Sequence, residues 1–400
     1  MLHPHERVKA LKGEGAFHWM NKAVKWERET GKKAIHFEIG EPDFRTPKNV
    51  CDAAVKALYD GKTKYVPSQG ISELRTAVAD FLGRRRGVEI DPDCVVVGPG
   101  CKPLINASFQ CMVDQTAPNA AVILPDPVYG PYADNAFFVG AKTYSVPLKQ
   151  EDDWRYDAGV LEEVIESIPA GLDKILVLVS PSNPTGGVLT RGDLKFIAKL
   201  AQEHDLTVVS DEIYDDIIFS KGQKYASVLS EPGMMDRTFL FHGSSKSWAM
   251  TGWRLGWCVA PKHFAGEVGK LIGHTVSCTA EFSQHAGIEA ISRCGNHVAE
   301  MVAEYRRRRD FAVTALRGLG ATTSTPMGSF YVFPDVSAWM QLKGVDETEL
   351  CERMLRETGV VCLPGPGFGS QGRNHIRLSL VSSYSDLQEA FERIEKWLAI

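Results

Sequence analysis

The chain has 400 residues, of which 44% are hydrophobic and 24% charged, and its formal net charge is −5 with a pI of about 6.2. These values are typical of a globular protein with a large core, and they exclude a disordered or fibrous chain. The acidic balance argues against a broad nucleic-acid-binding surface, which needs an excess of basic residues.

Cysteine usage and the amino terminus indicate the compartment. The nine cysteines are odd in number and include no CxxC pair, so we expect reduced thiols in a cytoplasmic protein. The amino terminus, MLHPHERVKALKGEG, lacks the apolar segment of a secretory signal. The apolar run at 175–179 is too short to cross a bilayer. We therefore expect no membrane partner.

Apolar runs alternate with helical patterns in the first two thirds of the chain. The predicted strands cover 95–97, 121–124, 175–179, 207–210, 238–241 and 255–259. The helices predicted between them include 102–112 and 191–204. This βαβ alternation predicts an α/β fold whose parallel sheet is covered by helices.

The loops that follow these strands are expected to converge, because ligands bind outside the carboxyl ends of the strands in such sheets. These loops are 98–102, 125–132, 180–187, 211–214 and 242–246. After about residue 280 a helical region at 286–318 precedes a few short strands and further helices, which indicates a second, α+β domain. The basic run at 306–309 is predicted to be the solvated face of one long amphipathic helix.

Several common catalytic motifs are missing from the sequence. GPGCKP at 98–103 begins like GxGxxG, but Pro103 replaces the third glycine. The strings GxxxxGK[ST], HExxH and GxSxG do not occur, which removes the simplest support for nucleotide hydrolases, zinc peptidases and α/β-hydrolases. The histidines show no metal-ligand spacing, so no metal site is predicted.

Lys246 follows a predicted strand within HGSSKSWAMTGWRLGW. A lysine among small residues at a strand end can be desolvated, which lowers its pKa and leaves an amine that attacks aldehydes. The alternative is an ordinary surface lysine. Arg254 lies in the glycine-rich turn that follows, from which a guanidinium could reach a phosphate.

Two further strand ends carry polar groups. Asp211 ends a buried strand in SDEIYDD, with Tyr214 close by, and its carboxylate needs a partner such as a cationic heterocycle or the start of a helix. Asn183 lies between two prolines in SPSNPTGG, where turn chemistry explains most of the segment. An amine, a carboxylate with a phenol, a rigid amide and an arginine are together the set that pyridoxal phosphate requires.

The sequence resembles the class I/II aminotransferases of the aspartate aminotransferase family, which have fold type I of the pyridoxal-phosphate enzymes. The resemblance runs from about residue 35 to the end. It is carried by EIGEPDF at 38–44, KYVPSQGISELR at 64–75, GPGCK at 98–102, DPVYGPY at 126–132, SPSNPTGG, DEIY, SSKSWAMTGWRLG, PMGSFY at 326–331, LPGPGFG at 363–369 and IRLSL at 376–380.

The resemblance implies a domain organisation. We expect an amino-terminal segment at 1–45 that packs with the small domain, and a large cofactor-binding domain at 46–285. A small carboxyl-terminal α+β domain would cover 286–400. The sheet of the large domain is expected to be mostly parallel and sandwiched by helices.

The resemblance also implies roles around the cofactor ring. Lys246 is similar to the lysine that bonds to the cofactor aldehyde and moves the proton in transamination. Asp211 is similar to the partner of the pyridine nitrogen, and Tyr214 and Asn183 to the donors to the ring oxygen. Tyr129 occupies the position of the aromatic residue that stacks on the ring.

The phosphate end of the cofactor is assigned in the same way. Gly100, Cys101 and Lys102 lie where backbone N–H groups at a helix N-terminus bind the phosphate. Arg254 is similar to the phosphate arginine. Tyr65 matches a tyrosine that reaches the phosphate of the neighbouring subunit in the family dimer. Some relatives have a serine where this chain has Gly243, so Ser244 is considered as a substitute, while Ser245 directly precedes Lys246 as in many relatives.

For the substrate, Arg377 is similar to the arginine that grips the α-carboxylate. Gly40 matches a glycine whose backbone lines the substrate pocket, and Asn183 lies in the same pocket. Lys102 lies where some relatives place a cation near a distal carboxylate, which favours an aspartate-type donor with 2-oxoglutarate as acceptor. The alternative for Lys102 is a residue that only starts a helix near the phosphate.

The resemblance therefore predicts a cytoplasmic, homodimeric aminotransferase with pyridoxal phosphate, ping-pong kinetics and active sites shared between subunits. A pyridoxal-phosphate C–S β-lyase or cyclase on the same fold is the alternative, because it uses the same lysine, aspartate and arginine. A ligand-sensing domain of a transcription regulator is a weaker alternative. It needs a DNA-binding domain in front, and only about 35 residues precede the matched region.

Overall fold

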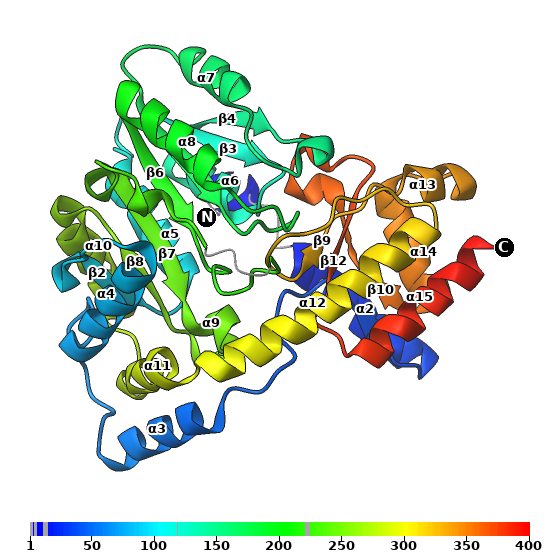
Figure 1. Cartoon of the computed structure of the whole chain (residues 1–400), viewed down its shortest axis with the longest axis horizontal. Coiled ribbons are helices and arrows are strands. Elements are labelled where there is room, and N and C mark those ends of the chain that lie inside the picture. Colours follow the sequence, from blue (N-terminus) through cyan, green and yellow to red (C-terminus); the bar gives the residue numbers. More distant parts are fainter. Residues whose placement is uncertain (1–2, 4–5, 11–14, 118, 221–224) are drawn as a thin grey trace.

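A seven-stranded β-sheet forms the centre of the larger part of the molecule (Figure 1). The computed structural model describes residues 3, 6–10, 15–117, 119–220 and 225–400. In sheet order, the strands are β2 (Val95–Gly98), β8 (Gly256–Val259), β7 (Thr238–Gly243), β6 (Leu206–Asp211), β5 (Asp173–Val179), β3 (Ala120–Asp126) and β4 (Lys142–Pro147). All neighbours run parallel except β8, which is antiparallel to β2 and β7. The predicted α/β fold with a mostly parallel sheet is confirmed.

Two strands of this sheet differ from the prediction. β4 was not predicted, because this edge strand exposes polar residues and lacks a continuous apolar run. β8 is antiparallel, because it returns from β7 through the loop 244–255 without the crossover helix that usually joins parallel strands.

Helices cover both faces of the sheet. The apolar residues of α5 (Cys101–Met112), α6 (Pro131–Val139) and α10 (Lys262–Val276) pack on the face that includes Val209 and Phe239. The opposite face, which includes Val208 and Leu240, is covered by α3 (Lys48–Tyr59), α4 (Ser72–Arg86), α7 (Ala158–Glu166), α8 (Arg191–Glu203) and α11 (Glu281–Arg293). Successive strand residues point to opposite faces, so strands covered on both sides are almost entirely apolar.

The region predicted as helical at 286–318 contains parts of two helices. α11 ends at Arg293, and α12 (Gly295–Gly318) begins after Cys294, whose φ of −109° and ψ of 23° are not helical. α12 extends from the larger part of the molecule to the smaller part (Figure 1). Side chains from both parts of the molecule therefore pack against α12 along its length.

This position of α12 overturns part of the prediction for the basic run at 306–309. Arg308 and Arg309 are buried and do not form a solvated face. Arg308 forms ion pairs with Asp43 at 2.8 Å and with Glu304 at 3.0 Å. Arg309 donates a hydrogen bond to the carbonyl of Pro326 at 2.8 Å. Helical periodicity alone does not show which basic residues meet such partners.

Two small sheets form the smaller part of the molecule. One is antiparallel, with the order β11 (Leu363–Pro364), β12 (Ile376–Ser379) and β9 (Tyr331–Val332). The other pairs β1 (Ile35–His36) in parallel with β10 (Val360–Val361). The remaining α-helices of the described ranges, from both parts of the molecule, are α1 (Glu6–Ala10), α2 (Gly15–Thr30), α9 (Ser244–Ser247), α13 (Ser337–Lys343), α14 (Glu347–Thr358) and α15 (Tyr384–Leu398).

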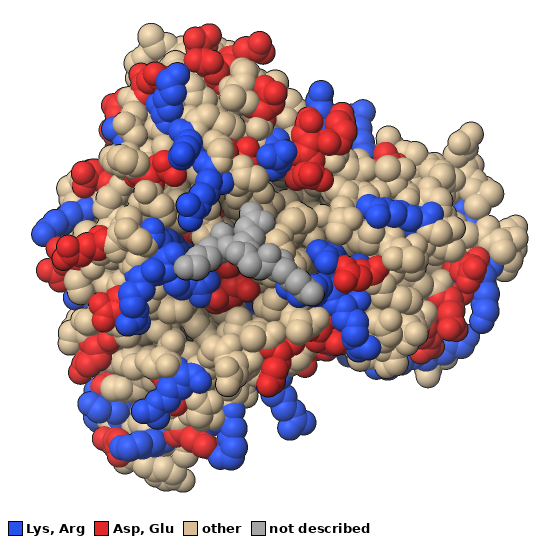
Figure 2. Space-filling model, in the orientation of Figure 1, with Lys and Arg blue, Asp and Glu red and all other residues tan. Residues whose placement is uncertain are grey.

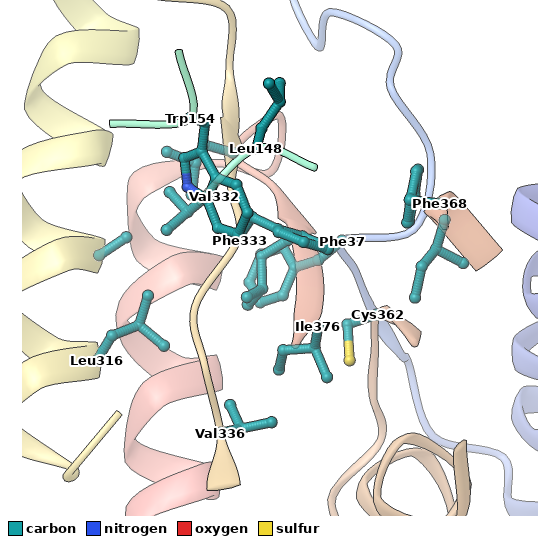
Figure 3. Close-up of a cluster of buried hydrophobic side chains, with 14 of the residues drawn as sticks. Phe37, Leu148, Trp154, Leu316, Val332, Phe333, Val336, Cys362, Phe368 and Ile376 are labelled. Carbon is teal, nitrogen blue, oxygen red and sulfur yellow. The ribbon is translucent and has the colours of Figure 1, made fainter. Parts of the chain in front are cut away.

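One apolar core joins the amino-terminal segment to both parts of the molecule. Figure 3 shows Phe37, Trp154, Phe333 and Ile376 within this cluster of buried side chains. The rings of Trp154 and Phe333 meet edge to face, with centroids 5.7 Å apart. Because this core crosses the expected boundaries near residues 45 and 285, the boundaries stay predictions.

A carboxylate at the end of β3 anchors a loop of the smaller part. Asp126 is buried, and its Oδ2 accepts hydrogen bonds from the N–H of Ser370 at 3.0 Å and from the Ser370 hydroxyl at 2.6 Å. Its Oδ1 accepts the N–H of Gln371 at 3.0 Å. The adjacent Val128 N–H donates to the carbonyl of Phe368 at 2.8 Å. The loop at 366–371 is thus fixed to the central sheet.

The turn after β6 is held by a buried arginine. Arg86, at the end of α4, forms ion pairs with Glu212 and, at 2.9 Å, with Asp215. Asp215 Oδ1 also lies 2.7 Å from His242 Nε2 on β7. Glu212 accepts a further hydrogen bond from the Ser210 hydroxyl at 2.9 Å. These contacts lie on one side of the turn. Asp211 and Tyr214 of the same turn face the other side.

The surface carries both signs of charge. Lysine and arginine side chains are interspersed with aspartate and glutamate over the face seen in Figure 2. Within the described ranges, none of the helices combines the length and apolarity needed to cross a membrane.

Arg86 offers a test of how the turn is held. Arg86→Met is expected to lower the free energy of unfolding by about 3 kcal/mol, because it leaves the buried carboxylate of Glu212 without its cation, whereas Asp215 keeps Arg85 at 3.5 Å. Denaturant unfolding followed by circular dichroism measures this loss. Arg84→Met is the control, because Arg84 is an exposed residue of the same helix, and its effect should stay within about 0.5 kcal/mol. Equal losses in the two variants would contradict the assignment.

Candidate active site

A cavity of about 1190 Å³ lies between the central sheet and the smaller part of the molecule. The loops after β2, β3, β5, β6 and β7 all contribute to its lining, together with residues of β9, β11 and β12. The expected convergence of the five loops is therefore confirmed. The predicted site residues that line the cavity are Gly40, Cys101, Lys102, Tyr129, Asn183, Asp211, Tyr214, Lys246, Arg254 and Arg377.

Lys246 lies in α9, the short helix that directly follows β7. Its Nζ donates a hydrogen bond to the carbonyl of Gly40 at 2.5 Å and lies 5.9 Å from the ring centroids of both Tyr214 and Phe330. Desolvation lowers the pKa of Lys246 to about 8, in the direction expected from the sequence. About a tenth of the amine is then neutral at pH 7, so the group can act as a nucleophile and as a base.

Gly40 brings its carbonyl to this amine because it has no side chain. A Cβ at this position would overlap the hydroxyl of Tyr331. Any other residue would therefore displace either the backbone or the tyrosine.

Asp211 ends β6 with its carboxylate buried at the cavity wall. Its Oδ2 accepts a hydrogen bond from the Tyr132 hydroxyl at 2.7 Å, and its Oδ1 accepts the N–H of Ile213 at 3.2 Å. Burial raises the pKa of Asp211, and these two hydrogen bonds oppose the rise. A cationic ring nitrogen in the cavity would offset the cost of burying the charge. Sequence reasoning did not identify Tyr132 as the residue that orients this carboxylate.

Tyr214 and Tyr331 form a pair of buried phenols. Their hydroxyl oxygens are 2.9 Å apart. Burial raises the pKa of Tyr214 well above its usual value, so the group stays a phenol and can donate its proton to an acceptor in the cavity. Tyr331 belongs to the PMGSFY motif, but no role was assigned to it from the sequence.

Arg377 lies on β12 and is buried. Its Nη1 donates to Asn183 Oδ1 at 3.1 Å, and its Nη2 donates to the carbonyl of Glu38. Within the described part of the chain, its Nε has no hydrogen-bond partner. Asn183 and Arg377 therefore meet, as expected, in one polar cluster. A carboxylate ligand would meet the donors that the guanidinium still offers.

A second candidate anion site lies at the start of α5. Gly100 precedes the helix with a φ of +91°, and a Cβ at this position would come within 2.5 Å of Arg254 Nη2. Arg254 itself has a φ of +51°, and its Nη1 donates to the carbonyl of Thr251 at 2.8 Å. The first N–H groups of a helix have no partner within it, so this glycine, helix and guanidinium together suit a phosphate.

The remaining groups near α5 have distinct orientations. The thiol of Cys101 donates to the carbonyl of His242 at 3.2 Å, and burial raises its pKa. Cys101 therefore holds its thiol in the protonated form, turned toward the His242 carbonyl, while the residue also lines the cavity. The hydroxyl of Ser244 donates to the carbonyl of Leu255 at 3.1 Å, whereas Ser245 lines the cavity. Of the two serines, Ser245 is thus the one placed to reach an anion.

An aromatic wall completes the cavity. Lys102 Nζ lies 5.6 Å from the ring centroid of Tyr129, and the rings of Tyr129 and Tyr132 meet edge to face at 6.5 Å. Phe17 and Trp19 of α2 also line the cavity. The lining is therefore cationic in part and aromatic in part.

Two predicted site residues do not line the cavity: Gly100, which lies beside Arg254 at the start of α5, and Tyr65. Tyr65 is the more distant case. It lies between α3 and α4 with 88% of its surface exposed. A single chain thus leaves this tyrosine on the outside.

The residues present fit pyridoxal phosphate. The desolvated amine of Lys246 suits an aldehyde, and Asp211 suits a pyridinium nitrogen. The glycine at position 100, which leaves room for the Arg254 guanidinium, suits a phosphate. These groups line one cavity that is large enough for the cofactor and an amino acid.

Known proteins are similar to this chain over most of its length. Residues 32–394 match the family "Aminotransferase class I and II". The chain is 36% identical to aromatic-amino-acid aminotransferase 2 of Thermococcus litoralis over 91% of each chain. It is 35% identical to an aspartate aminotransferase of Pyrococcus horikoshii, with 98% of this chain and 96% of that protein covered.

The fold is also similar to that of solved structures. The aspartate aminotransferase of Thermus thermophilus with maleate superposes with a TM-score of 0.92 at 32% identity. The match covers 99% of this chain and 100% of that one. The fold and the sequence thus point to the same group of proteins.

The lowered pKa of Lys246 predicts how this residue reacts. With no cofactor bound, pyridoxal followed by borohydride should label Lys246 with a rate that rises as the pH passes through about 8, because the neutral amine reacts. Lys199, an exposed lysine of α8, is the reference residue. Peptide mass spectrometry measures both residues in one sample. Identical pH profiles for the two lysines would contradict the desolvated site.

Proposed function

The chain belongs to the class I and II aminotransferases, enzymes of the pyridoxal-phosphate fold type I, and we propose that it moves an amino group from an acidic L-amino acid to a 2-oxo acid. Members of this family generally use pyridoxal phosphate as their cofactor. The observation that carries the proposal is the desolvated amine of Lys246 in one cavity with Asp211, Arg254 and Arg377.

Different residues would bind the phosphate of the cofactor, the oxygen of its ring and the α-carboxylate of the substrate. Arg254 and the first N–H groups of α5 would hold the phosphate, and Tyr214 and Asn183 would donate to the ring oxygen. Arg377 would bind the α-carboxylate of the donor through its guanidinium. Pyridoxal phosphate supplies an aldehyde for the amino group and a ring that withdraws electrons from the α-carbon.

The proton transfers fall to this chain's own residues. Lys246 would hold the cofactor through its aldehyde, and the amino donor would take the place of Lys246 there. The freed amine then lies beside the Gly40 carbonyl and takes the proton from the α-carbon. Asp211, oriented by Tyr132, holds the proton on the ring nitrogen. Lys246 would return this proton, and one water would hydrolyse the bond to nitrogen, so that a 2-oxo acid leaves and the amino group stays with the cofactor. A second 2-oxo acid reverses these steps, so the kinetics are ping-pong.

The amino donor is proposed to be aspartate, with 2-oxoglutarate as acceptor. Lys102 lines the cavity on the side of Tyr129 and could meet a second carboxylate. Several relatives carry the name aspartate aminotransferase. An aromatic donor is the second candidate, since Phe17, Trp19 and Tyr129 line the same cavity and one relative is named for aromatic amino acids. The comparisons do not favour the C–S β-lyase alternative.

Lys102→Met tests the acidic donor. It should reduce kcat/KM for aspartate about 10- to 100-fold, because a charged hydrogen bond contributes about 1.5–3 kcal/mol. Turnover of phenylalanine should change less than threefold. Steady-state assays with aspartate, alanine and phenylalanine measure this difference.

Two controls accompany this assay. Lys199→Met removes an exposed lysine of α8 and should change neither donor. Lys246→Ala should abolish transamination of every donor. An equal loss for aspartate and phenylalanine in Lys102→Met would show that Lys102 does not read the second carboxylate. Transamination retained by Lys246→Ala would refute the proposed function.

We further propose a homodimer in which Tyr65 completes the phosphate site of the partner subunit. The exposure of Tyr65 in the single chain supports this arrangement, because a second copy could cover it. Tyr59 and Leu58, at the end of α3, are exposed on the same stretch of chain.

Hybrid dimers test whether Tyr65 acts between subunits. Tyr65→Phe should weaken cofactor binding severalfold, and Lys246→Ala should be inactive. A hybrid of these two subunits contains one site with an intact lysine and an intact tyrosine. Mixing the subunits should therefore restore up to half of the wild-type activity per dimer, measured at limiting cofactor. Hybrids no more active than Tyr65→Phe would show that Tyr65 acts within its own subunit or not at all.

A further inference from the structure

Tyr331 contacts three residues to which the site assigns a function. It begins β9 and is 2% exposed. Its hydroxyl lies 2.9 Å from that of Tyr214, and the same hydroxyl fills the space beside Gly40. The guanidinium carbon of Arg377 lies 4.5 Å from its ring centroid. One side chain therefore touches groups on the cofactor side and on the substrate side of the cavity.

The hydrogen bond between the two phenols has a defined direction when the cofactor is bound. Each phenol has one proton to donate. If Tyr214 donates its proton to the ring oxygen of the cofactor, the bond of 2.9 Å must use the proton of Tyr331. Tyr331 then fixes the rotation of the Tyr214 hydroxyl and polarises it, which strengthens its donation to the ring oxygen.

The ring of Tyr331 has a separate role. It offers its face to Arg377, and the two hydrogen bonds from Arg377 to Asn183 and to the Glu38 carbonyl fix the guanidinium on other sides. A cation over an aromatic face is stabilised by about 0.5–2 kcal/mol when the pair is desolvated. The ring thus supports the plane in which a carboxylate would be bound.

We propose that Tyr331 is a positioning residue with two separable functions: its hydroxyl sets Tyr214 for the cofactor, and its ring sets Arg377 for the substrate carboxylate. This inference rests on the proposed function, because it requires the cofactor and an amino acid in this cavity.

The two functions are separated by two substitutions. Tyr331→Phe removes the hydroxyl and keeps the ring. The pH midpoint of the visible absorbance of the cofactor-loaded protein should rise by about half a unit, because the anionic ring oxygen loses stabilisation. KM for the amino donor should stay within twofold. Tyr331→Leu removes the ring as well, and KM for the donor should rise about tenfold or more.

A double-substitution cycle tests whether the hydroxyl acts through Tyr214. In a Tyr214→Phe background, Tyr331→Phe should produce no further shift of the absorbance midpoint. Tyr305→Phe is the matched control, since Tyr305 is also buried and its hydroxyl has no hydrogen-bond partner within the described part of the chain. It should leave both the midpoint and KM unchanged. Thermal unfolding of each variant checks that the fold is retained.

The results distinguish this inference from the proposed function. Wild-type protein that forms no visible absorbance with pyridoxal phosphate would refute the proposed function itself. If the wild type binds the cofactor and transaminates, an equal midpoint shift in both backgrounds would overturn the role of the hydroxyl. A KM in Tyr331→Leu no higher than in Tyr331→Phe would overturn the role of the ring.

Discussion

Arg86 binds two carboxylates of a single turn, and the positions of Asp211 and Tyr214 at the cavity depend on this buried charge. Glu212 and Asp215 face the guanidinium, while Asp211 and Tyr214 of the same turn face the cavity. The charged residues inside the turn therefore fix the direction of the functional residues outside it. A buried carboxylate without its cation is strongly unfavourable, so a rotation that takes Glu212 away from Arg86 would be costly.

The amino-terminal segment completes the site by using its backbone. The carbonyl of Glu38 accepts a hydrogen bond from Arg377, and the carbonyl of Gly40 accepts one from Lys246. The two cations proposed to handle the substrate are thus held by residues two positions apart. The side chain of Glu38 is itself buried against His36, with Oε1 2.7 Å from Nδ1, and this hydrogen bond raises the pKa of His36. The segment 36–40 links the small sheet to the lysine of the large one.

The sequence predicted the strands and the cavity-lining loops because buried parallel strands are continuous apolar runs that end in glycine, proline and polar residues. It identified Lys246 and Asp211 because their chemistry is unusual at the end of a buried strand, and it identified Arg377 through the family resemblance alone. It did not identify Tyr132 or Tyr331 as partners, since a tyrosine in a motif looks the same whether it packs, stacks or donates. The error at Arg308 and Arg309 has a similar cause: helical periodicity gives the face of a residue, but the partner across that face comes from a distant part of the chain.

The anchor at Asp126 bears on how this cavity can change during evolution. Asp126 accepts the backbone N–H groups of Ser370 and Gln371, so most of its grip is independent of the side chains that the loop carries. Phe368 and Gly367 of the same loop line the cavity. A side chain added at position 367 would meet open space, whereas the Phe368 ring is buried in the apolar core and lies 5.2 Å from the guanidinium carbon of Arg377. A change in the cavity lining through this loop therefore destabilises the protein less at position 367 than at position 368.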